Sequence, residues 1–219
     1  MKTILAYGDS LTWGGDPASG GRHAYEDRWP SVLEGALNGA ARVIAEGLSG
    51  RTTSFDDHTS LADLNGARTL PMVLATHAPL DAVVIMLGTN DLKPRLCGHA
   101  LAAAIGMRRL AEIVVTFPFA PGTPRPGILL VSPPVITTAS QANALSSFGD
   151  AGPESRKLAP LYRQIARDAG CGFFDAGAVA GTSPADGVHL DAANTRAIGL
   201  AVAPSIMAML QLSASGDRS

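Results

Sequence analysis

The sequence of 219 residues carries little charge, few aromatic side chains and only two cysteines. Charged residues make up 16% of the chain, the formal net charge is −2, and no run of lysine or arginine occurs. A nucleic-acid partner is therefore not expected, because such proteins need a basic surface that follows the phosphates. Cys97 and Cys171 lie far apart and lack the CxxC or histidine spacing of a zinc site, so we expect no metal.

Two further kinds of segment are missing. The chain has neither a P-loop nor a GxGxxG fingerprint, so we expect no nucleotide, flavin or other cofactor. The first apolar run, MKTILA, stops before Gly8 and Asp9 and is too short for the apolar region of a signal peptide. No uninterrupted apolar stretch approaches the roughly 20 residues that span a bilayer. We expect a soluble, cytoplasmic protein with reduced thiols and no membrane contact.

Apolar residues make up 46% of the chain, which is enough for a sizeable core. We predict one domain over residues 1–219, with a flexible tail from about residue 212. The predicted strands are Thr3–Tyr7, Arg42–Glu46, Ala82–Leu87, Ile128–Val131 and Gly172–Phe174. The predicted helices are Trp29–Leu37, Ala67–His77, Leu101–Thr116, Glu154–Ala169 and Ala192–Leu210. Loops are expected over Gly14–Asp27, Pro118–Pro126 and Pro134–Pro153.

Strands that alternate with helices indicate βαβ units and a parallel sheet covered on both faces. Five strands in this pattern predict an α/β fold, a flavodoxin-like three-layer α/β/α sandwich, although the strand order does not follow from the sequence. Ligands of such sheets bind beyond the carboxyl ends of the strands. The segments at these ends are GDSLTWG, GLSGRTT, GTNDLKP, SPP and DAG.

Ser10 follows the first predicted strand and a Gly-Asp turn, and a helix-compatible pattern begins only further on. A serine hydroxyl is a poor nucleophile until a nearby base takes its proton. By itself Ser10 could equally serve as a turn or cap residue that hydrogen-bonds to the backbone. A catalytic interpretation therefore requires a base elsewhere in the chain.

His189 is the best candidate base among the five histidines. Asp186 precedes it by three residues in the segment ADGVHLDAAN, where a carboxylate can fold back onto Nδ1 and leave Nε2 free. Asp191 is expected to cap the last helix, which leaves Asp186 available. The other histidines, His23, His58, His77 and His99, lack such a neighbour and are interpreted as structural or solvated.

A serine hydrolase also needs hydrogen-bond donors for the oxyanion of its tetrahedral intermediate. The side-chain amide of Asn90 follows the third strand, and Gly50 after the second strand allows close approach to its backbone N–H. The amide of Ser10 would be a further donor. GTND could also form a simple Asx turn, so this interpretation depends on all the pieces lying on one rim.

GDSLTWG, the glycine of GLSGRTT, GTND and DGVH, in this order, resemble the four sequence blocks of the SGNH, or GDSL-type, serine hydrolases. The resemblance covers essentially the whole chain and implies the same flavodoxin-like fold. It also implies Ser10 as nucleophile, His189 as base and Asp186 as the residue that orients it. Ser10, Gly50 and Asn90 would form the oxyanion hole. The second block reads EGLSG and lacks the asparagine that many members place before the glycine.

The segments EDRW, LNGA and LPMVLATHAPLDAVVIMLGTNDLK resemble more closely the bacterial arylesterase and acyltransferase branch of this family. Members of that branch act on short-chain esters, transfer acyl groups to alcohols or peroxide, and form homo-octamers. The resemblance therefore implies a homo-oligomer, an octamer. It also suggests that four residues contact the substrate: Asp9, Leu11, Trp13 and Lys93. Asp9 could instead organise the turn, and Trp13 could instead belong to the core.

Together these features predict a serine esterase that hydrolyses small, acetyl-type esters of aryl alcohols or carbohydrates through an acyl-serine intermediate. An acyltransferase or perhydrolase activity would use the same intermediate. A carbohydrate O-deacetylase is the alternative within the same chemistry. The alternative from another class is a catalytically silent ligand-binding domain, which would predict a disrupted triad, whereas every required position is filled.

Overall fold

A computed structural model describes residues 1–137 and 147–212 of the chain. The strands are β1 (Lys2–Gly8), β2 (Ala41–Gly47), β3 (Ala82–Met86), β4 (Gly127–Ser132) and β5 (Gly172–Asp175). The helices are α1 (Ser10–Trp13), α2 (Trp29–Ala36), α3 (Gly66–His77), α4 (Ala100–Thr116), α5 (Gly152–Ser155), α6 (Leu158–Ala169) and α7 (Ala192–Leu210). Short 3₁₀ helices are η1 (Tyr25–Asp27), η2 (Asn90–Leu92) and η3 (Ala176–Ala178).

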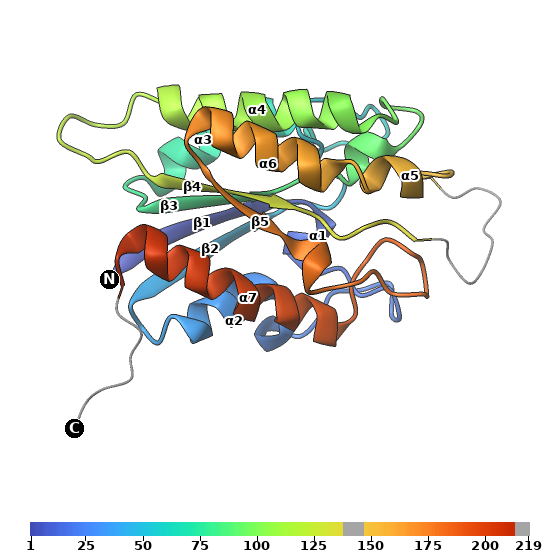
Figure 1. Cartoon of the computed structure of the whole chain (residues 1–219), viewed down its shortest axis with the longest axis horizontal. Helices are drawn as coiled ribbons and strands as arrows, with labels where there is room; N and C mark the ends of the chain where they lie inside the picture. Colours follow the sequence, from blue (N-terminus) through green and yellow to red (C-terminus); the bar gives the residue numbers. More distant parts are fainter. Residues whose placement is uncertain (138–146, 213–219) are drawn as a thin grey trace.

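The five strands form one parallel sheet with the order β2-β1-β3-β4-β5. Helices α3, α4 and α6 cover one face and α2 and α7 cover the other (Figure 1). The predicted three-layer α/β/α sandwich is confirmed. The chain adds β2 on one side of β1 and then adds β3, β4 and β5 on the other side, so the strand order switches between β1 and β3. Such a switch point opens a crevice at the carboxyl ends of the strands.

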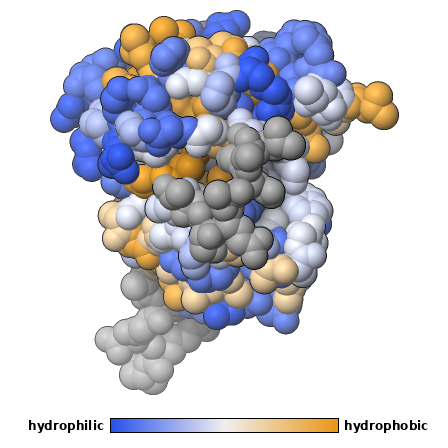
Figure 2. Space-filling view, turned by 90° about the vertical axis from the view of Figure 1, so that its right-hand side faces the viewer, coloured by the Kyte–Doolittle hydropathy of each residue, from blue (hydrophilic) through white to orange (hydrophobic). Residues whose placement is uncertain are grey.

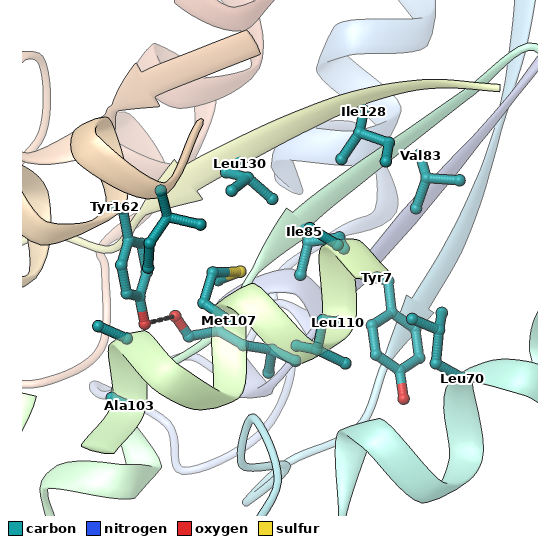
Figure 3. Packing of buried hydrophobic residues seen from close by; sticks show 14 of the residues in the cluster. Tyr7, Leu70, Val83, Ile85, Ala103, Met107, Leu110, Ile128, Leu130 and Tyr162 are labelled. Carbon is teal, nitrogen blue, oxygen red and sulfur yellow. Dashed lines mark hydrogen bonds between the residues drawn. The ribbon is translucent and has the colours of Figure 1, made fainter. Parts of the chain in front are cut away.

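The residues of each strand alternate between two apolar layers. Tyr7, Val83, Ile85 and Leu130 belong to the cluster beneath α3, α4 and α6, and they pack with Met107 and other residues shown in Figure 3. Their strand neighbours belong to the second cluster, with α2 and α7: these include Ile4, Ala6, Val84, Met86 and Val131. Since both faces of the sheet are covered, the central strands β3 and β4 read as nearly continuous apolar runs.

The last helix, α7, is long and apolar enough by length and composition to cross a membrane. Asn194 and Arg196 interrupt its apolar sequence, so a search for an unbroken run does not single it out. Ile198, Val202 and Ile206 are buried against the sheet. This face of α7 packs in the second apolar layer. As predicted, Asp191 caps α7, accepting a hydrogen bond from the N–H of Asn194 at 2.8 Å.

Two local predictions are corrected by the structure. A helix begins at Ser10 itself, because the Asp9 carboxylate accepts the N–H of Leu11 and so caps α1 directly after β1. The helix predicted over Glu154–Ala169 is divided into α5 and α6. Pro160 has no N–H to donate to the carbonyl of Arg156, which favours a break there. Residues 138–146 of one predicted loop, and the predicted tail beyond residue 212, lie outside the described residues.

Two helical glycines give a matched test of packing. A Cβ on Gly106 of α4 would lie 1.9 Å from Oγ1 of Thr53, whereas a Cβ on the exposed Gly35 of α2 would meet nothing within 4 Å. Thr53 is buried and hydrogen-bonded to Asp91, so it cannot move aside freely. We expect Gly106→Ala to lower the free energy of unfolding by about 1–3 kcal/mol.

The control, Gly35→Ala, should raise that free energy by about 0.4–1 kcal/mol, because alanine loses less backbone entropy on folding. Urea denaturation of the two variants beside the wild type provides the measurement. A Gly106→Ala protein as stable as Gly35→Ala would contradict the tight packing described for α4.

Candidate active site

Ser10 lies where β1 passes into α1, at the carboxyl edge of the sheet. The Asp9 carboxylate binds the N–H of Leu11 at 2.9 Å and fixes the turn. A Cβ on Gly8 would lie 2.0 Å from Oγ1 of Thr12, so a residue without a side chain lets α1 fold back over the strand end. Ser10 is partly exposed while its neighbours are buried. The turn therefore presents the Ser10 hydroxyl at the rim.

His189 and Asp186 reach Ser10 from the loop before α7. Nε2 of His189 lies 2.9 Å from Oγ of Ser10, and Nδ1 lies 2.6 Å from Oδ2 of Asp186. Because a carboxylate can only accept, Nδ1–H donates to Asp186, and Nε2 is left to accept the hydroxyl proton of Ser10. The other oxygen of Asp186 accepts the N–H groups of Val188 and His189, each at 2.9 Å.

The charge of Asp186 follows from these contacts. Burial by itself would raise the pKa of this carboxyl, but the hydrogen bonds from His189 and from the two amides outweigh it. The pKa of Asp186 therefore lies below its ordinary value of 3.8. The group stays ionised at neutral pH and can stabilise an imidazolium on His189.

The three predicted oxyanion donors belong to the segments that follow β1, β2 and β3. Helix α1 begins at Ser10, so the N–H of this residue has no partner within the helix. Gly50 has a φ of +88°, a conformation that favours glycine. Within residues 1–137 and 147–212, neither of these two N–H groups donates to another protein atom. Nδ2 of the buried Asn90 completes the set and lies 3.1 Å from the carbonyl of Arg51 and 3.3 Å from Oδ2 of Asp9.

Two carboxyl groups are buried behind these donors. Burial raises the pKa of Asp9 to about 6, although the bond from Leu11 partly opposes the shift. Burial also raises the pKa of Asp91 to about 6, although hydrogen bonds from Thr53 favour its charged form. Both carboxyls are therefore easier to protonate than exposed ones.

A serine hydroxyl on an imidazole that a carboxylate orients is the arrangement typical of a serine hydrolase. The sequence profile of the GDSL-like lipase/acylhydrolase family matches residues 6–197. The chain belongs to this family. It is accordingly a carboxylic ester hydrolase, and the resemblance noted in its four sequence blocks is confirmed.

Solved structures extend this similarity. The esterase is 53% identical to a carbohydrate acetylesterase family member from Sinorhizobium meliloti, with a TM-score of 0.94 over 97% of this chain and 100% of that one. It is 42% identical to an aryl esterase from M. smegmatis, with a TM-score of 0.90 over 96% and 100%. A second carbohydrate acetylesterase from Sinorhizobium meliloti is 39% identical, with a TM-score of 0.90 over 95% and 100%. A comparison with curated proteins found no match.

The four residues suggested as substrate contacts have different surroundings in this esterase. Asp9 organises the turn at Ser10, and Leu11 packs in the apolar layer of α2 and α7. Trp13 is partly buried, with the guanidinium of Arg22 4.8 Å from the ring centroid. Lys93 is partly buried, and its ammonium lies 5.2 Å from the ring centroid of Phe148. A substrate contact from any of them stays a prediction.

Sequence reasoning missed two residues that support the site. Nε2 of the buried His23 lies 2.8 Å from the carbonyl of Leu190, so His23 ties loop 14–27 to the segment beside His189. The backbone carbonyl of Arg51 accepts a hydrogen bond from Nδ2 of Asn90. Arg51 follows Gly50 directly and is the only charged residue in GLSGRTT, and this position could have marked it as a residue that supports the site. Nothing adjacent in the sequence marks His23. No group of three or more metal-ligating side chains lies together in the described part of the chain.

Asp186→Asn tests the orientation of His189. An asparagine amide turned toward Nδ1 would favour the wrong tautomer, so kcat should fall by about 10⁴-fold while the fold is retained. Steady-state kinetics with p-nitrophenyl acetate and circular dichroism provide the measurements. Asp175→Asn, at the end of β5 and outside the hydrogen-bond chain of Ser10, His189 and Asp186, serves as the control. A normal kcat in folded Asp186→Asn would remove Asp186 from the mechanism.

Proposed function

We propose that Ser10 is the nucleophile of this esterase, with His189 as its general base and Asp186 as the residue that orients His189. The proposal is carried by the hydrogen-bond chain from Ser10 through His189 to Asp186, with distances of 2.9 and 2.6 Å. Nucleophile and base already lie within the reach that proton transfer requires.

Acylation starts when Oγ of Ser10 attacks the ester carbonyl carbon and its proton passes to Nε2 of His189. The negative oxygen of the tetrahedral intermediate accepts hydrogen bonds from the amides of Ser10 and Gly50 and from Asn90, whose Nδ2 redirects to it the N–H that lies toward Asp9 at 3.3 Å in the free enzyme. The bond from carbon to the leaving oxygen then breaks, and the imidazolium of His189 donates its proton to that oxygen. An alcohol or phenol leaves, and the acyl group remains on Ser10.

Deacylation repeats these steps with water in place of Ser10. His189 takes a proton from the water, whose oxygen attacks the acyl carbon, and the proton then returns to Oγ of Ser10 as the acid leaves. An alcohol that enters instead of water gives a new ester by the same route. We therefore infer that acyl transfer accompanies hydrolysis when an acceptor alcohol is present.

The substrate is inferred to be a short-chain, acetyl-type ester of an aryl alcohol or a carbohydrate. Both kinds of alcohol are supported by the names of similar proteins, which are an aryl esterase and two carbohydrate acetylesterases. The carbohydrate ester is the second candidate because it occurs in the names of relatives that are 53% and 39% identical.

A serine variant tests the proposed nucleophile. The wild type should release p-nitrophenol from p-nitrophenyl acetate and should react covalently with a fluorophosphonate, whereas Ser10→Ala should do neither because the attacking oxygen is gone. Ser205→Ala, on the distant helix α7, is the matched control and should keep both properties. Fluorophosphonate labelling of Ser10→Ala would refute this assignment, and a wild type that remains unlabelled would indicate a silent binding domain.

Comparison of kcat/KM for aryl acetates and acetylated sugars, with and without added alcohol, distinguishes the substrate classes.

We also propose that the esterase forms a homo-oligomer, an octamer in line with the branch that its sequence resembles. Leu101 and Ile105 lie on one side of α4 and are each 63% exposed, beside a groove of about 820 Å³ that Pro160 and Leu161 also line. Hydrophobic surface is visible over this layer at the top of Figure 2. Sedimentation velocity should give the mass of an octamer, and Ile105→Glu should lower it. A monomer at micromolar concentration would contradict the proposal.

A further inference from the structure

Arg51 is a buried arginine, 4% exposed, whose side chain returns to the carboxyl ends of two strands. Its Nη1 donates to the carbonyl of Gly8, at 2.8 Å, and to the carbonyl of Glu46. Gly8 ends β1, and Glu46 lies at the penultimate position of β2. One nitrogen therefore joins the strand that leads to Ser10 with the strand that leads to Gly50.

The backbone of Arg51 holds the two other donor segments. Its N–H binds the carbonyl of Leu48 at 3.0 Å and closes the turn that contains Gly50. Its carbonyl accepts Nδ2 of Asn90 at 3.1 Å, from the segment after β3. All three segments that carry the proposed oxyanion donors are thus attached to this one residue.

Stability alone does not account for an arginine at this position. Arg51 forms no ion pair with a carboxylate in the described ranges 1–137 and 147–212, and its buried Nε has no hydrogen-bond partner there. The guanidinium lies 4.2 Å from the ring centroid of Tyr7, and burial lowers the pKa of Arg51 despite nearby charges that oppose the shift. A buried charge with an unpaired donor is costly, and apolar residues of similar size commonly stabilise such sites.

We propose that Arg51 is a positioning residue of the oxyanion hole, which fixes the Ser10, Gly50 and Asn90 donors in one geometry without touching the substrate. This inference rests on the proposed roles of Ser10 and of these donors. The oxyanion is tetrahedral and charged, whereas the ester carbonyl is planar and neutral, so correct placement of the donors matters most in the transition state. Loss of the clamp should therefore lower kcat far more than it changes KM.

Arg51→Met tests the clamp, because methionine fills much of the space without donating to either carbonyl. We expect kcat for p-nitrophenyl acetate to fall by about 10²-fold, while KM changes by less than about threefold. Arg51→Lys keeps a cation, but its shorter stem cannot hold both strand-end carbonyls in the geometry of the guanidinium, so kcat should still fall by about tenfold. The lysine variant provides the test should the methionine variant not fold.

Binding of two ketones separates positioning from a general loss of structure. The hydroxyl of Ser10 adds to the carbonyl carbon of phenyl trifluoromethyl ketone and forms a tetrahedral oxyanion. Acetophenone instead binds as a neutral ground-state analogue. In the Arg51 variants the affinity for the first should fall by the same factor as kcat, and the affinity for the second should stay unchanged. A residue with a merely structural role would lower the Tm and leave this ratio of affinities unaltered.

Two controls complete the experiment. Arg163→Met also removes a guanidinium from an aromatic ring, that of Phe173 at 4.6 Å, and among the described residues the Arg163 side chain makes no hydrogen bond to the strand ends of the site. Ile206→Ala lowers the Tm through a cavity in the distant α7 layer. Both should keep the wild-type kcat and the ratio of ketone affinities.

The possible results have distinct meanings. A wild-type kcat in a folded Arg51 variant, or an equal loss of affinity for both ketones, would overturn the role of Arg51. If Ser10→Ala is inactive in the same experiment, the proposed function stands even when the Arg51 inference fails. If Ser10→Ala is active, the proposed function itself is wrong.

Discussion

The parallel register of the three strands around β1 is the constraint on which the site depends. Gly8 is paired with Gly47 of β2 on one side and with Met86 of β3 on the other, so the three strands end at one level. The segments that follow them carry Ser10, Gly50 and Asn90. A Cβ on Gly47 would lie 2.2 Å from the backbone nitrogen of Trp13, so this glycine lets α1 lie across the strand ends. A slip of one pair would move a donor by about 3.3 Å, which is more than a hydrogen bond tolerates.

His189, the proposed base, comes to Ser10 from the far end of the chain and is held by contacts on several sides. The carbonyl of His189 accepts the N–H of Ser183 at 2.7 Å, and the next carbonyl accepts Nε2 of His23. A Cβ on Gly15 would lie 3.2 Å from Cδ2 of His189, so the loop after α1 packs closely against the imidazole. The imidazole therefore has little freedom to leave Ser10, which is the kind of preorganisation that acyl transfer needs.

Polar groups buried beneath the donors are a cost that the fold carries. Asp9, Arg51 and Asp91 are each at most 4% exposed, and burial shifts the pKa of each toward the neutral form. The apolar layers on both faces of the sheet, seen in Figure 3 for one of them, supply the stability that offsets this cost. The buried polar layer thus combines fixed hydrogen bonds near Ser10 with a desolvation cost that the apolar layers offset.

The sequence by itself determined the strand and helix pattern and the residues with the chemistry of a serine esterase. Apolar runs, caps such as Asp191 and the local spacing of Asp186 and His189 act over a few residues, so they can be read along the chain. Only the tertiary structure decided the strand order and the contacts of His23 and Arg51. These depend on which strands lie side by side and on atoms separated by up to 167 residues, and no local pattern encodes such distances.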